Sequence, residues 1–411
     1  MAAQATQTIL TVNSGSSSLK FRLYEMGAGE VLLSKGAAEG IDQGPGRLWL
    51  QDADGSMVLD EPLADVGHAA AVDRTMAALA SGDLPSIEAI GHRVVHGGPN
   101  QSAPVRVTDE LLADLDGHIA WAPNHMPAAL RAIRALRAAD PVMPQVACFD
   151  TAFHAVMPEV ARRLPLPRPL FDQGVRKYGF HGLSYESVFA ELGPRAAGRT
   201  VAAHLGNGAS MVACLDGRPV DTTMGMSPLG GFMMGTRSGD LDPGVVVYLG
   251  SRHVYAMDEV ESLLAERSGL LGVSGETADM EQLLALCDAG HAAANQAVDM
   301  FCYQARRAVG SLAAALGGLD HLVFTAGIGE NAPAVRANIC RGLAHLGVVL
   351  DDDRNAVSAD VISAAGSRCD VLVVHTREDL MIARHTHALV FGADGAVPAA
   401  PAPTPDEGGA A

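Results

Sequence analysis

Two short stretches of this chain, far apart in the sequence, follow the same pattern. Residues 13–19 read NSGSSSL and residues 205–211 read LGNGASM. In each, an apolar strand leads into a turn of small residues and then, through a serine, into a second strand, which predicts a β-hairpin. A turn without side-chain bulk lets its backbone amides face an anion. Two such hairpins indicate a duplicated domain that binds a nucleotide between its halves.

The second hairpin is followed by a glycine-rich segment that carries a cation. A guanidinium in a segment that can approach a ligand closely favours phosphate chemistry. The alternative is that the glycines only form tight turns and that Arg237 is a surface charge, because short glycine motifs match many unrelated proteins. The glycines around Arg237 are Gly230, Gly231, Gly235 and Gly239.

Length and composition limit the class of protein. The 411 residues are 48% hydrophobic and 18% charged, which is enough to bury the cores of two or three domains. The net charge is −18, from 29 basic and 47 acidic side chains. This charge disfavours binding to nucleic acid or to an acidic membrane, although a local group of arginines still attracts phosphate.

Neither the cysteines nor the N-terminus indicates export. The six cysteines are widely spaced without a Cys-x-x-Cys pair, which predicts reduced, buried thiols. The first residues, MAAQATQTIL, contain no basic leader, and no run of about 18 apolar residues follows. We therefore expect a soluble, cytoplasmic protein that binds no membrane. The cysteines are Cys148, Cys214, Cys287, Cys302, Cys340 and Cys369.

The spacing of apolar residues predicts alternating strands and helices. Strands are expected at residues 8–13, 19–24, 87–98, 145–149, 201–203, 210–215, 321–324 and 370–375, with hairpins between residues 31 and 60. Helices are expected at residues 69–80, 128–139, 244–250, 257–267, 279–286, 292–316 and 378–388. We expect a loop at 268–279, a glycine turn at 325–329, and a helix capped by Asn331 with Pro333 in its first turn.

Several polar side chains stand where strands end or helices begin. Asp150 follows a buried strand, the usual place for a catalytic or metal-holding carboxylate. Arg93 lies just before the pair Gly97–Gly98. His125 and His181 each precede a helix, a position that suits contact with an anion, and His181 lies between glycines. The alternatives are a helix cap for Asp150 and a capping or core role for His125.

Other candidates have ordinary structural interpretations. Lys20 shares a strand face with Ser18, but a lysine at such a position is usually solvated, and a serine-rich turn is usually only a turn. His92 and His96 could suggest a metal site. Because no further ligands lie nearby in the sequence, we expect structural or hydrogen-bonding histidines.

Eight motifs, spread over almost the whole chain, occur in the order found in one enzyme family. They are residues 13–20, 91–98, 149–154, 178–182, 204–208, 233–240, 327–331, and Glu378 with 380–384. On these motifs the chain resembles the acetate kinase family, of the acetate and sugar kinase, heat-shock 70 and actin superfamily. Together the motifs are highly specific, whereas the sequence contains no Walker A motif, kinase glycine-rich loop or dinucleotide fingerprint.

The resemblance implies a duplicated ribonuclease H-like α/β fold, the actin-like ATPase fold, with a central cleft. We expect an N-terminal, substrate-side domain at residues 1–150 and a C-terminal nucleotide-binding domain at 151–385. A segment at about 386–395 returns to the first domain, and a disordered tail follows at 396–411. The resemblance also implies ATP or ADP as co-substrate, Mg²⁺ or Mn²⁺ as the metal, and a homodimer.

The resemblance further implies roles for individual residues. Arg93 and Arg237 flank the carboxylate and the transferring phosphoryl group, and His181 contacts the phosphoryl oxygens. Asn13 and Asp150 complete the catalytic group, and both are expected to hold the metal together with Glu378. The implied nucleotide-binding residues are Lys20, Ser16, Ser18, His204, Gly206, Asn207, Gly208, Asp279, Gly327, Ile328, Gly329 and Asn331. The implied acyl-binding residues are Arg93, Val95, Asn124, His125, Phe180 and Pro228.

Some positions depart from the pattern of the family. Asn124 stands where Leu is usual, which leaves the preferred carboxylic acid open. Glu281 replaces the usual Arg after Asp279 and Met280, which bears on the choice of phosphate donor. The other departures are Met126, Leu183, Tyr185, Gly230 and Arg377, where the family usually has Asn, Thr, His, Glu and Asn.

These expectations converge on reversible phosphoryl transfer. The reaction that we expect from the resemblance is transfer of the γ-phosphoryl group of ATP to acetate, directly and in line, to give acetyl phosphate and ADP. One alternative acceptor is propionate or another short acyl acid. An alternative of another class is a nucleotide-gated interaction protein, since relatives of this fold use ATP to open and close on partners. Arg93, Arg237 and His181 favour the enzyme, because such a protein does not need all three around a small pocket.

Overall fold

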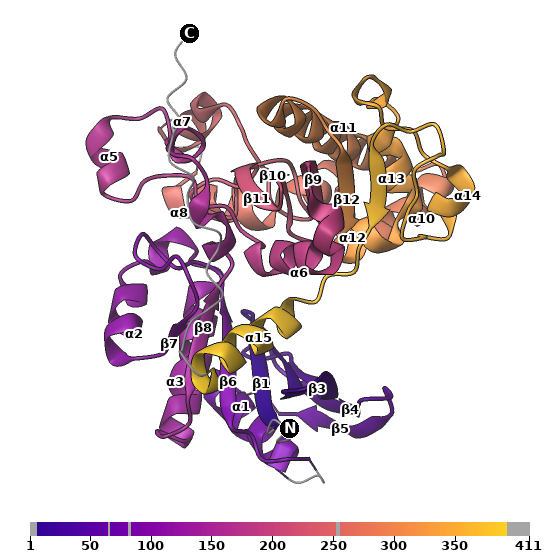
Figure 1. The fold of residues 1–411 in the computed structure, drawn as a ribbon. Helices are drawn as coiled ribbons and strands as arrows, with labels where there is room; N and C mark the ends of the chain where they lie inside the picture. Colours follow the sequence, from indigo (N-terminus) through magenta and orange to yellow (C-terminus); the bar gives the residue numbers. More distant parts are fainter. Residues whose placement is uncertain (1–5, 65, 81–83, 252–254, 393–411) are drawn as a thin grey trace, which may run out of the picture. The chain divides into compact units, whose positions relative to one another are not determined.

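The computed structural model describes residues 6–64, 66–80, 84–251 and 255–392 (Figure 1). The chain divides into two compact units, Met1–Val156 with Arg377–Ala411, and Met157–Thr376. The expected tail at residues 396–411 lies outside the described residues, as does the end of the segment 386–395. Within the described residues, no helix is both long and apolar enough to cross a membrane.

The first unit is built on an eight-stranded mixed sheet of order β5-β4-β3-β2-β1-β6-β8-β7. Strands β1 to β5 form a continuous antiparallel ladder that includes the first expected hairpin, whereas β6 and β8 continue the sheet in parallel with β1. The strands are β1 (Gln7–Ser14), β2 (Ser18–Met26), β3 (Glu30–Glu39), β4 (Gly46–Asp52), β5 (Met57–Leu63), β6 (Ala89–Val94), β7 (Val105–Arg106) and β8 (Gln145–Phe149).

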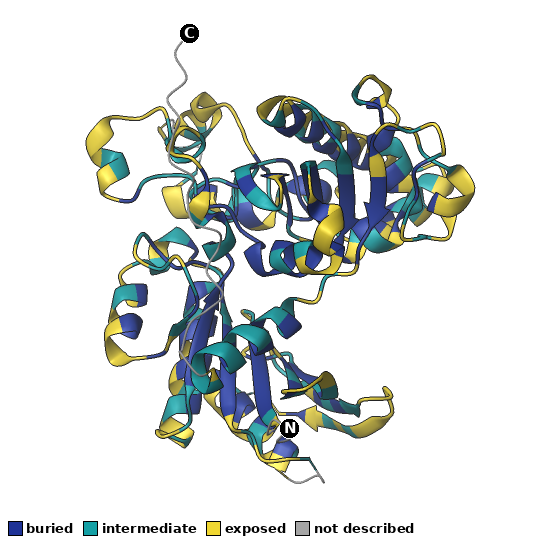
Figure 2. Ribbon diagram, in the orientation of Figure 1, coloured by how far each residue is buried: buried dark blue, intermediate teal, exposed yellow. Residues whose placement is uncertain are grey.

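Side-chain alternation along β1 divides the core of this unit between two helical layers. Leu10 and Val12 pack with residues of α1 and α3, whereas Ile9 packs against α15, because successive side chains of a strand point to opposite faces. The central strands are therefore buried, while β5 is largely exposed (Figure 2). The helices are α1 (His68–Ala80), α2 (Asp109–Asp116), η1 (Ile119–Trp121), α3 (Met126–Ala139), η2 (Ala152–Val156) and α15 (Glu378–Phe391).

The second unit contains a five-stranded mixed sheet of order β11-β10-β9-β12-β13. β9 and β10 form the second expected hairpin, and β12 and β13 run parallel to β9. β9 and β10 are buried along almost their whole length, as expected for strands covered on both faces. The strands are β9 (Arg199–Leu205), β10 (Ala209–Leu215), β11 (Arg218–Thr222), β12 (His321–Thr325) and β13 (Asp370–Val373).

The long helix α11 (Ala292–Leu316) packs across β9, β10 and β11 and against α9, α10 and α13. Nine of its residues are buried, among them Phe301 and Val309, so this helix forms much of the core of the second unit. The other helices are α4 (Glu159–Arg162), α5 (Arg168–Asp172), α6 (Gly182–Leu192), η3 (Gly193–Ala196), α7 (Pro243–Ser251), α8 (Met257–Glu266), α9 (Gly269–Ser274), α10 (Met280–Asp288), α12 (Ala326–Asn331), α13 (Pro333–Cys340), η4 (Ala344–Leu346) and α14 (Asp352–Ala356).

The two sheets share a five-strand core with the same order and directions. Strands β3-β2-β1-β6-β8 of the first unit correspond to β11-β10-β9-β12-β13 of the second, with two antiparallel pairings followed by two parallel ones. The prediction of a duplicated α/β domain is therefore confirmed. Strands β4, β5 and β7 are additions to the first copy.

In each half of the chain, a helix that comes later than the last parallel strand of one unit's core packs in the other unit. Helix α6 comes after β8 but packs against β9, and α15 comes after β13 but packs against β1, β2, β6 and β8. Because all of α15 packs in the first unit, the division falls at Thr376 and Arg377 rather than near residue 385. The first unit also includes the 3-10 turn η2, so the other division falls after Val156 rather than after the expected residue 150.

Two glycine-rich segments that we expected to be irregular are helical. Helix α9 lies within the expected loop at 268–279, and α12 replaces the expected glycine turn at 325–329. Asn331 ends α12, so Ala332 rather than Asn331 is the N-cap of α13, although Pro333 opens that helix as expected. The Glu330 carboxylate accepts a hydrogen bond from Ala326 N (2.8 Å), which helps to hold the first turn of α12.

The six cysteines are unpaired, and all except Cys287 are buried. Burial raises the pKa of Cys302, Cys340 and Cys369 to about 12, so these thiols stay protonated at neutral pH. The expectation of buried thiols therefore holds for five of the six.

Candidate active site

In the first unit, four polar residues gather at one edge of the sheet. Asn13 lies near the end of β1, Arg93 is the second-last residue of β6, and Asp150 directly follows β8. These three strands are parallel, so their carboxyl ends meet at one edge, where α/β sheets usually bind ligands. Glu378, the first residue of α15, joins them through its contact with Arg93.

Arg93 is held by two carboxylates. Its Nε donates to Oδ1 of Asp150 (2.9 Å) and its Nη2 to Oδ2 (2.7 Å), a bidentate pair, and its Nη1 lies 3.4 Å from Oε2 of Glu378. Burial opposes the charge, but Asp150 and Glu378 outweigh it and hold the pKa of Arg93 above its usual range. The Arg93 side chain is 18% exposed and that of Asp150 is 2% exposed. The guanidinium is therefore fixed and charged, yet still reached by solvent.

The oxygen atoms around Arg93 fit a magnesium ion that is also bound by phosphates. Mg²⁺ is usually held by one or two carboxylates and by substrate phosphates rather than by a cage of protein ligands. Asp150 and Glu378 supply two carboxylates, and Asn13 supplies an amide oxygen near the same edge. Among the described residues, no group of three or more His, Cys, Asp or Glu side chains could hold a metal.

The first hairpin turn carries three of the predicted nucleotide contacts. Gly15 N donates to Ser18 O (2.8 Å), which closes the turn, and His68 Nε2 lies 3.0 Å from Gly15 O. Ser18 and Lys20 lie two positions apart on β2 and share a face, and Ser16 and Lys20 are exposed. The structure thus places Ser16 in the turn, and Ser18 and Lys20 at the start of the strand that follows it.

The residues predicted to contact the acyl group are divided between the units. In the first unit, Val95 follows β6 and packs partly on the core, Asn124 is exposed, and His125 occupies the N-cap of α3 as expected. Phe180 and Pro228 are buried in the second unit. A shared acyl pocket stays a prediction.

In the second unit, two side chains approach the turn of the glycine hairpin. A Cβ atom on Gly208 would lie 3.2 Å from His181 Nε2 and 3.4 Å from Arg237 Nη1. Both side chains therefore lie against the backbone of Gly208, where an added Cβ atom would make close contacts with them. Gly206 N donates to Gly208 O (3.1 Å), which closes the turn. The structure thus brings together His181, Gly208 and Arg237 from three separate segments of the second unit.

His181 and His204 form a stacked pair beside this turn. Their ring centroids are 4.0 Å apart and their planes differ by 11°. Nδ1 of His181 lies 2.9 Å from Ser210 Oγ, and Nδ1 of His204 lies 2.8 Å from Ser184 Oγ. The backbone of His181 is left-handed, with φ at 58°, where it begins α6. Because Nδ1 of His181 is directed to Ser210, the other ring nitrogen, Nε2, lies near Gly208.

The loop that carries Arg237 is fastened to the hairpin turn. Gly235 N donates to Asn207 O (3.0 Å), and Met234 N donates to Arg237 O (3.0 Å), which closes a turn around Gly235. Arg237 Nη1 donates to Pro228 O (3.2 Å). The glycine loop and the glycine hairpin, adjacent in sequence, therefore form one structure.

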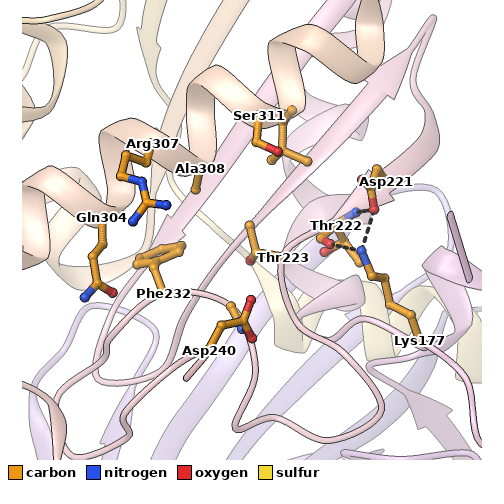
Figure 3. A pocket seen from close by; sticks show the side chains of 12 residues that line it. Lys177, Asp221, Thr222, Thr223, Phe232, Asp240, Gln304, Arg307, Ala308 and Ser311 are labelled. Carbon is orange, nitrogen blue, oxygen red and sulfur yellow. Dashed lines mark hydrogen bonds and ion pairs between the residues drawn. The ribbon is translucent and has the colours of Figure 1, made fainter. Parts of the chain in front are cut away.

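A cavity of about 380 Å³ lies behind the Arg237 loop, between that loop, β11 and α11 (Figure 3). Asp240 closes the loop, because its Oδ1 accepts from Gly231 N (2.8 Å) and its own N donates to Gly231 O (2.6 Å). From α11, Gln304 Oε1 accepts from Met233 N (2.9 Å). The lining is Lys177, Asp221, Thr222, Thr223, Gly231, Phe232, Asp240, Gln304, Arg307, Ala308, Ser311 and Leu312.

A second cavity, of about 660 Å³, lies beside the hairpin turn, near α10 and α12. Its lining includes six residues predicted to bind the nucleotide, namely Gly206, Asn207, Asp279, Gly327, Ile328 and Asn331. His204, Gly208 and Gly329, which were also predicted, are outside the lining. The side chain of Asp279 also caps α10 by accepting from Gln282 N (2.9 Å).

Other lining residues of this cavity lie in segments that the sequence marked only in outline. Thr277 and Ala278 belong to the expected loop at 268–279, which could line a ligand, and Ala332 belongs to the expected turn and helix start after the glycines. Leu284 carried no signal and reaches the cavity because the fold brings α10 to it. Glu281 also lines it. The residue at the position where the family usually has Arg therefore lines this cavity.

Arg336 was missed by sequence reasoning, although it supports this cavity. Its side chain is completely buried, and its Nη1 donates to the carbonyls of Gly329 (2.8 Å) and Glu330 (2.9 Å) in α12. Its Nε and Nη2 donate to Asn355 and Ser358. An arginine in α13 has no local motif that would indicate these partners.

The histidines near Arg93 have hydrogen-bonding roles. His92 is buried, with its Nε2 2.9 Å from Gln145 Oε1, and His96 Nδ1 accepts from Gly98 N (2.9 Å). Burial lowers the pKa of His92 to about 4. Both contacts agree with the structural interpretation.

Comparison with known proteins agrees with the geometry. A model of the acetokinase family matches residues 8–384. An acetate kinase of Rhodopseudomonas palustris is 46% identical over 403 residues, covering 94% of this chain and 99% of that protein. An acetate kinase of Coprothermobacter proteolyticus is 41% identical over 402 residues, covering 93% and 99%.

Solved structures of this family share the fold. The crystal structure of Porphyromonas gingivalis acetate kinase is similar with a TM-score of 0.83 at 37% identity, covering 92% of this chain and 98% of that one. A propionate kinase from Francisella tularensis is similar with a TM-score of 0.86 at 36% identity, with the same coverage. The expected actin-like ATPase fold is thus confirmed. The chain belongs to the acetokinase family, whose members are phosphotransferases that act on a carboxyl group.

Proposed function

We propose that this chain transfers the γ-phosphoryl group of ATP to acetate, reversibly and in line, giving acetyl phosphate and ADP. The observation that carries the proposal is the turn Gly206–Gly208. Gly206 and Asn207 line the 660 Å³ cavity, and Gly208 faces His181 and Arg237. A nucleotide with its adenosine in the cavity would therefore extend its phosphates toward an imidazole and a guanidinium.

We assign proposed contacts to each part of the nucleotide. Asp279, Gly327, Ile328 and Asn331 would hold the adenosine, and the amides of the hairpin turn, with His204, would cradle the phosphates. Ser16, Ser18 and Lys20 of the first unit would complete the contacts. Glu281 in the lining adds a negative charge, so we propose that it influences which phosphate donor binds best.

The transfer step needs cations more than it needs a base. A carboxylate oxygen is already a nucleophile, so it attacks the γ-phosphorus while the bond to the bridging oxygen breaks and that electron pair leaves with ADP. The barrier comes from bringing two anions together and from the charge on the phosphoryl oxygens. Arg93 would bind the carboxylate, and Arg237 and His181 would bind the phosphoryl oxygens. These charges and donors would already be in place before the reaction.

Magnesium fits this proposal through Asp150, Glu378 and Asn13. When bound, the ion would neutralise charge on the phosphates. Asp150 has a second role that does not depend on the ion, because it fixes the Arg93 guanidinium through two hydrogen bonds. The same carboxylate would therefore link the orientation of the arginine to the metal.

Propionate or another short acid is the second candidate acceptor. The observation in its favour is the similarity to a solved propionate kinase. Asn124, at a position where the family usually has Leu, argues instead for the shorter acid, because a polar side chain beside an acyl group disfavours burying additional methylene groups. We also propose a homodimer, as the family resemblance implies, and a location in the cytoplasm, as the cysteines and the N-terminal sequence indicate.

The test is formation of acyl hydroxamate from ATP with acetate, propionate and butyrate in parallel. Arg237→Ala should lower the rate with every acid by about 10²–10³, the loss expected for one cationic contact to a developing charge. Arg341→Ala, which removes an exposed arginine of the same unit, is the matched control and should leave the rate unchanged. ATP binding without product from any acid would instead indicate a nucleotide-gated binding protein.

A further inference from the structure

A chain of hydrogen bonds leads from the interior of the second unit to the ring of His181. The hydroxyl of Tyr185 lies 2.6 Å from Ser210 Oγ, and Ser210 Oγ lies 2.9 Å from His181 Nδ1. Tyr185 and Ser210 are completely buried. Hydrogen bonds shielded from water hold their geometry more firmly than exposed ones, so this chain fixes whatever it contacts.

We propose that Ser210 and Tyr185 are positioning residues that set the tautomer and orientation of His181, so that its Nε2 carries the ring proton and donates to the transferring phosphoryl group. The effect on catalysis rests on the proposed phosphoryl transfer, whereas the tautomer of His181 does not depend on it.

The direction of the chain follows from the donor capacity of its members. A serine hydroxyl has one proton, so if Ser210 donates to His181 Nδ1 it accepts from Tyr185. A phenol is the more acidic of the two hydroxyls and therefore the better donor, which favours the order Tyr185 to Ser210 to His181. In a neutral imidazole, an accepting Nδ1 leaves the proton on Nε2.

This tautomer suits the place to which Nε2 points. Nε2 of His181 and Nη1 of Arg237 are the two atoms nearest to a Cβ built on Gly208, at 3.2 and 3.4 Å. With the proton on Nε2, both groups would offer donors to one anion. The other tautomer would present a lone pair to the phosphoryl oxygens. A flipped ring would place carbon instead of nitrogen against Ser210 Oγ.

His204 provides a matched comparison within the same stack. Its Nδ1 lies 2.8 Å from Ser184 Oγ, and Ser184 is buried as completely as Ser210. Ser184→Ala and Ser210→Ala therefore remove the same group from two neighbouring rings. Only the second substitution should change the ring of His181.

The tautomer is measured directly by ¹⁵N NMR of protein labelled at histidine, with His181→Gln to assign the signals. We expect Nδ1 of His181 to be unprotonated and Nε2 protonated. Ser210→Ala should move both signals toward a mixture of tautomers, Tyr185→Phe should move them less in the same direction, and Ser184→Ala should move only those of His204. A proton on Nδ1 in the unaltered protein, or signals that do not change in Ser210→Ala, would overturn the proposal whether or not the chain is a kinase.

Kinetics test the consequence for catalysis. Ser210→Ala should lower kcat about tenfold and Tyr185→Phe about threefold, the scale of one lost hydrogen bond, with each KM within about twofold. In a His181→Ala background both substitutions should change kcat by less than about twofold, since the ring on which they act is gone. Equal losses in both backgrounds would show a merely structural role and overturn the proposal. Tyr185→Phe keeps the buried ring, so it carries the test if Ser210→Ala does not fold.

Discussion

The turns of two equivalent hairpins, β1–β2 and β9–β10, hold the same position in sheets of the same order but present different chemistry. The first turn offers side chains, with Ser16 and Lys20 exposed. The second offers backbone, and His181 and Arg237 reach it at Gly208. The duplicated topology therefore determines where a ligand site can form, and the residues of each turn determine which contacts it makes.

A second comparison is between two arginines, Arg93 in the first unit and the completely buried Arg336 in the second. Arg93 pairs with two carboxylates and keeps a pKa above its usual range. Arg336 makes five hydrogen bonds, all to neutral oxygens, and burial lowers its pKa. Both guanidinium groups stay charged. Arg93 is paired with acidic side chains at the candidate site, whereas Arg336 cross-links α12 and α14.

Replacing Arg93 should produce the largest effect on activity. Arg93→Ala removes the cation at the carboxyl edge of the first sheet, and we expect kcat/KM to fall by about 10²–10³ in the hydroxamate assay. Arg93→Lys keeps the charge but loses the bidentate pair with Asp150, so its loss should be intermediate. Arg47→Ala, which breaks only an exposed pair with Asp60, is the control. Equal activity of Arg93→Ala and Arg47→Ala would remove the proposed role.

Replacing Arg336 should mainly reduce stability. Arg336→Met leaves buried carbonyl and amide oxygens of α12 and α14 without donors, and we expect a loss of about 3 kcal/mol in the free energy of unfolding. Both tryptophans, Trp49 and Trp121, lie in the first unit. Circular dichroism should therefore show an earlier transition that tryptophan fluorescence does not report. Identical shifts in both signals would contradict the assignment of the effect to the second unit.

Most strands and the long helices could be predicted from the sequence because their signals are local, whereas the short strands β7 and β11 were not predicted. The apolar runs that became β1, β8 and β9, and the helical spacing of α3, depend only on neighbouring residues. Helices α9 and α12 could not be predicted, since glycine disfavours a helix unless distant contacts hold it. For α12 these contacts come from Arg336 and from Thr376 N, which donates to Glu330 Oε1 (3.1 Å).

The candidate site was predictable where a motif marks a residue type at a turn. Glycines around Arg237 and an acid at the end of β8 are signals of this kind. Ser210 and Tyr185 were not predicted to belong to the site, because their role depends on a tertiary contact with His181. The residues that support a catalytic group are therefore harder to find from sequence than the group itself.

The contrast between the two hairpin turns can be tested with a matched pair of glycine substitutions. In Gly208→Ala the new methyl group meets His181 Nε2 and Arg237 Nη1, and we expect kcat to fall about thirtyfold because both are displaced. In Gly15→Ala the nearest atom is Ser18 Oγ at 3.3 Å, a flexible side chain, so the loss should stay within about threefold. Similar losses in the two variants would indicate that the turns contribute in the same way.

The smallest expected effect concerns the stability of the first unit in mild acid. Burial lowers the pKa of His92 to about 4, below the value of about 6.5 in the unfolded chain, so the unfolded state binds the proton first. The stability that His92 contributes in its neutral form is therefore present above pH 6.5 and is lost as the pH falls toward 4. At pH 6 the loss in the free energy of unfolding is about 1 kcal/mol. Urea unfolding followed by tryptophan fluorescence at pH 7 and pH 6 measures this change, and His92→Leu should reduce it. An unchanged difference in His92→Leu would assign the effect to another group.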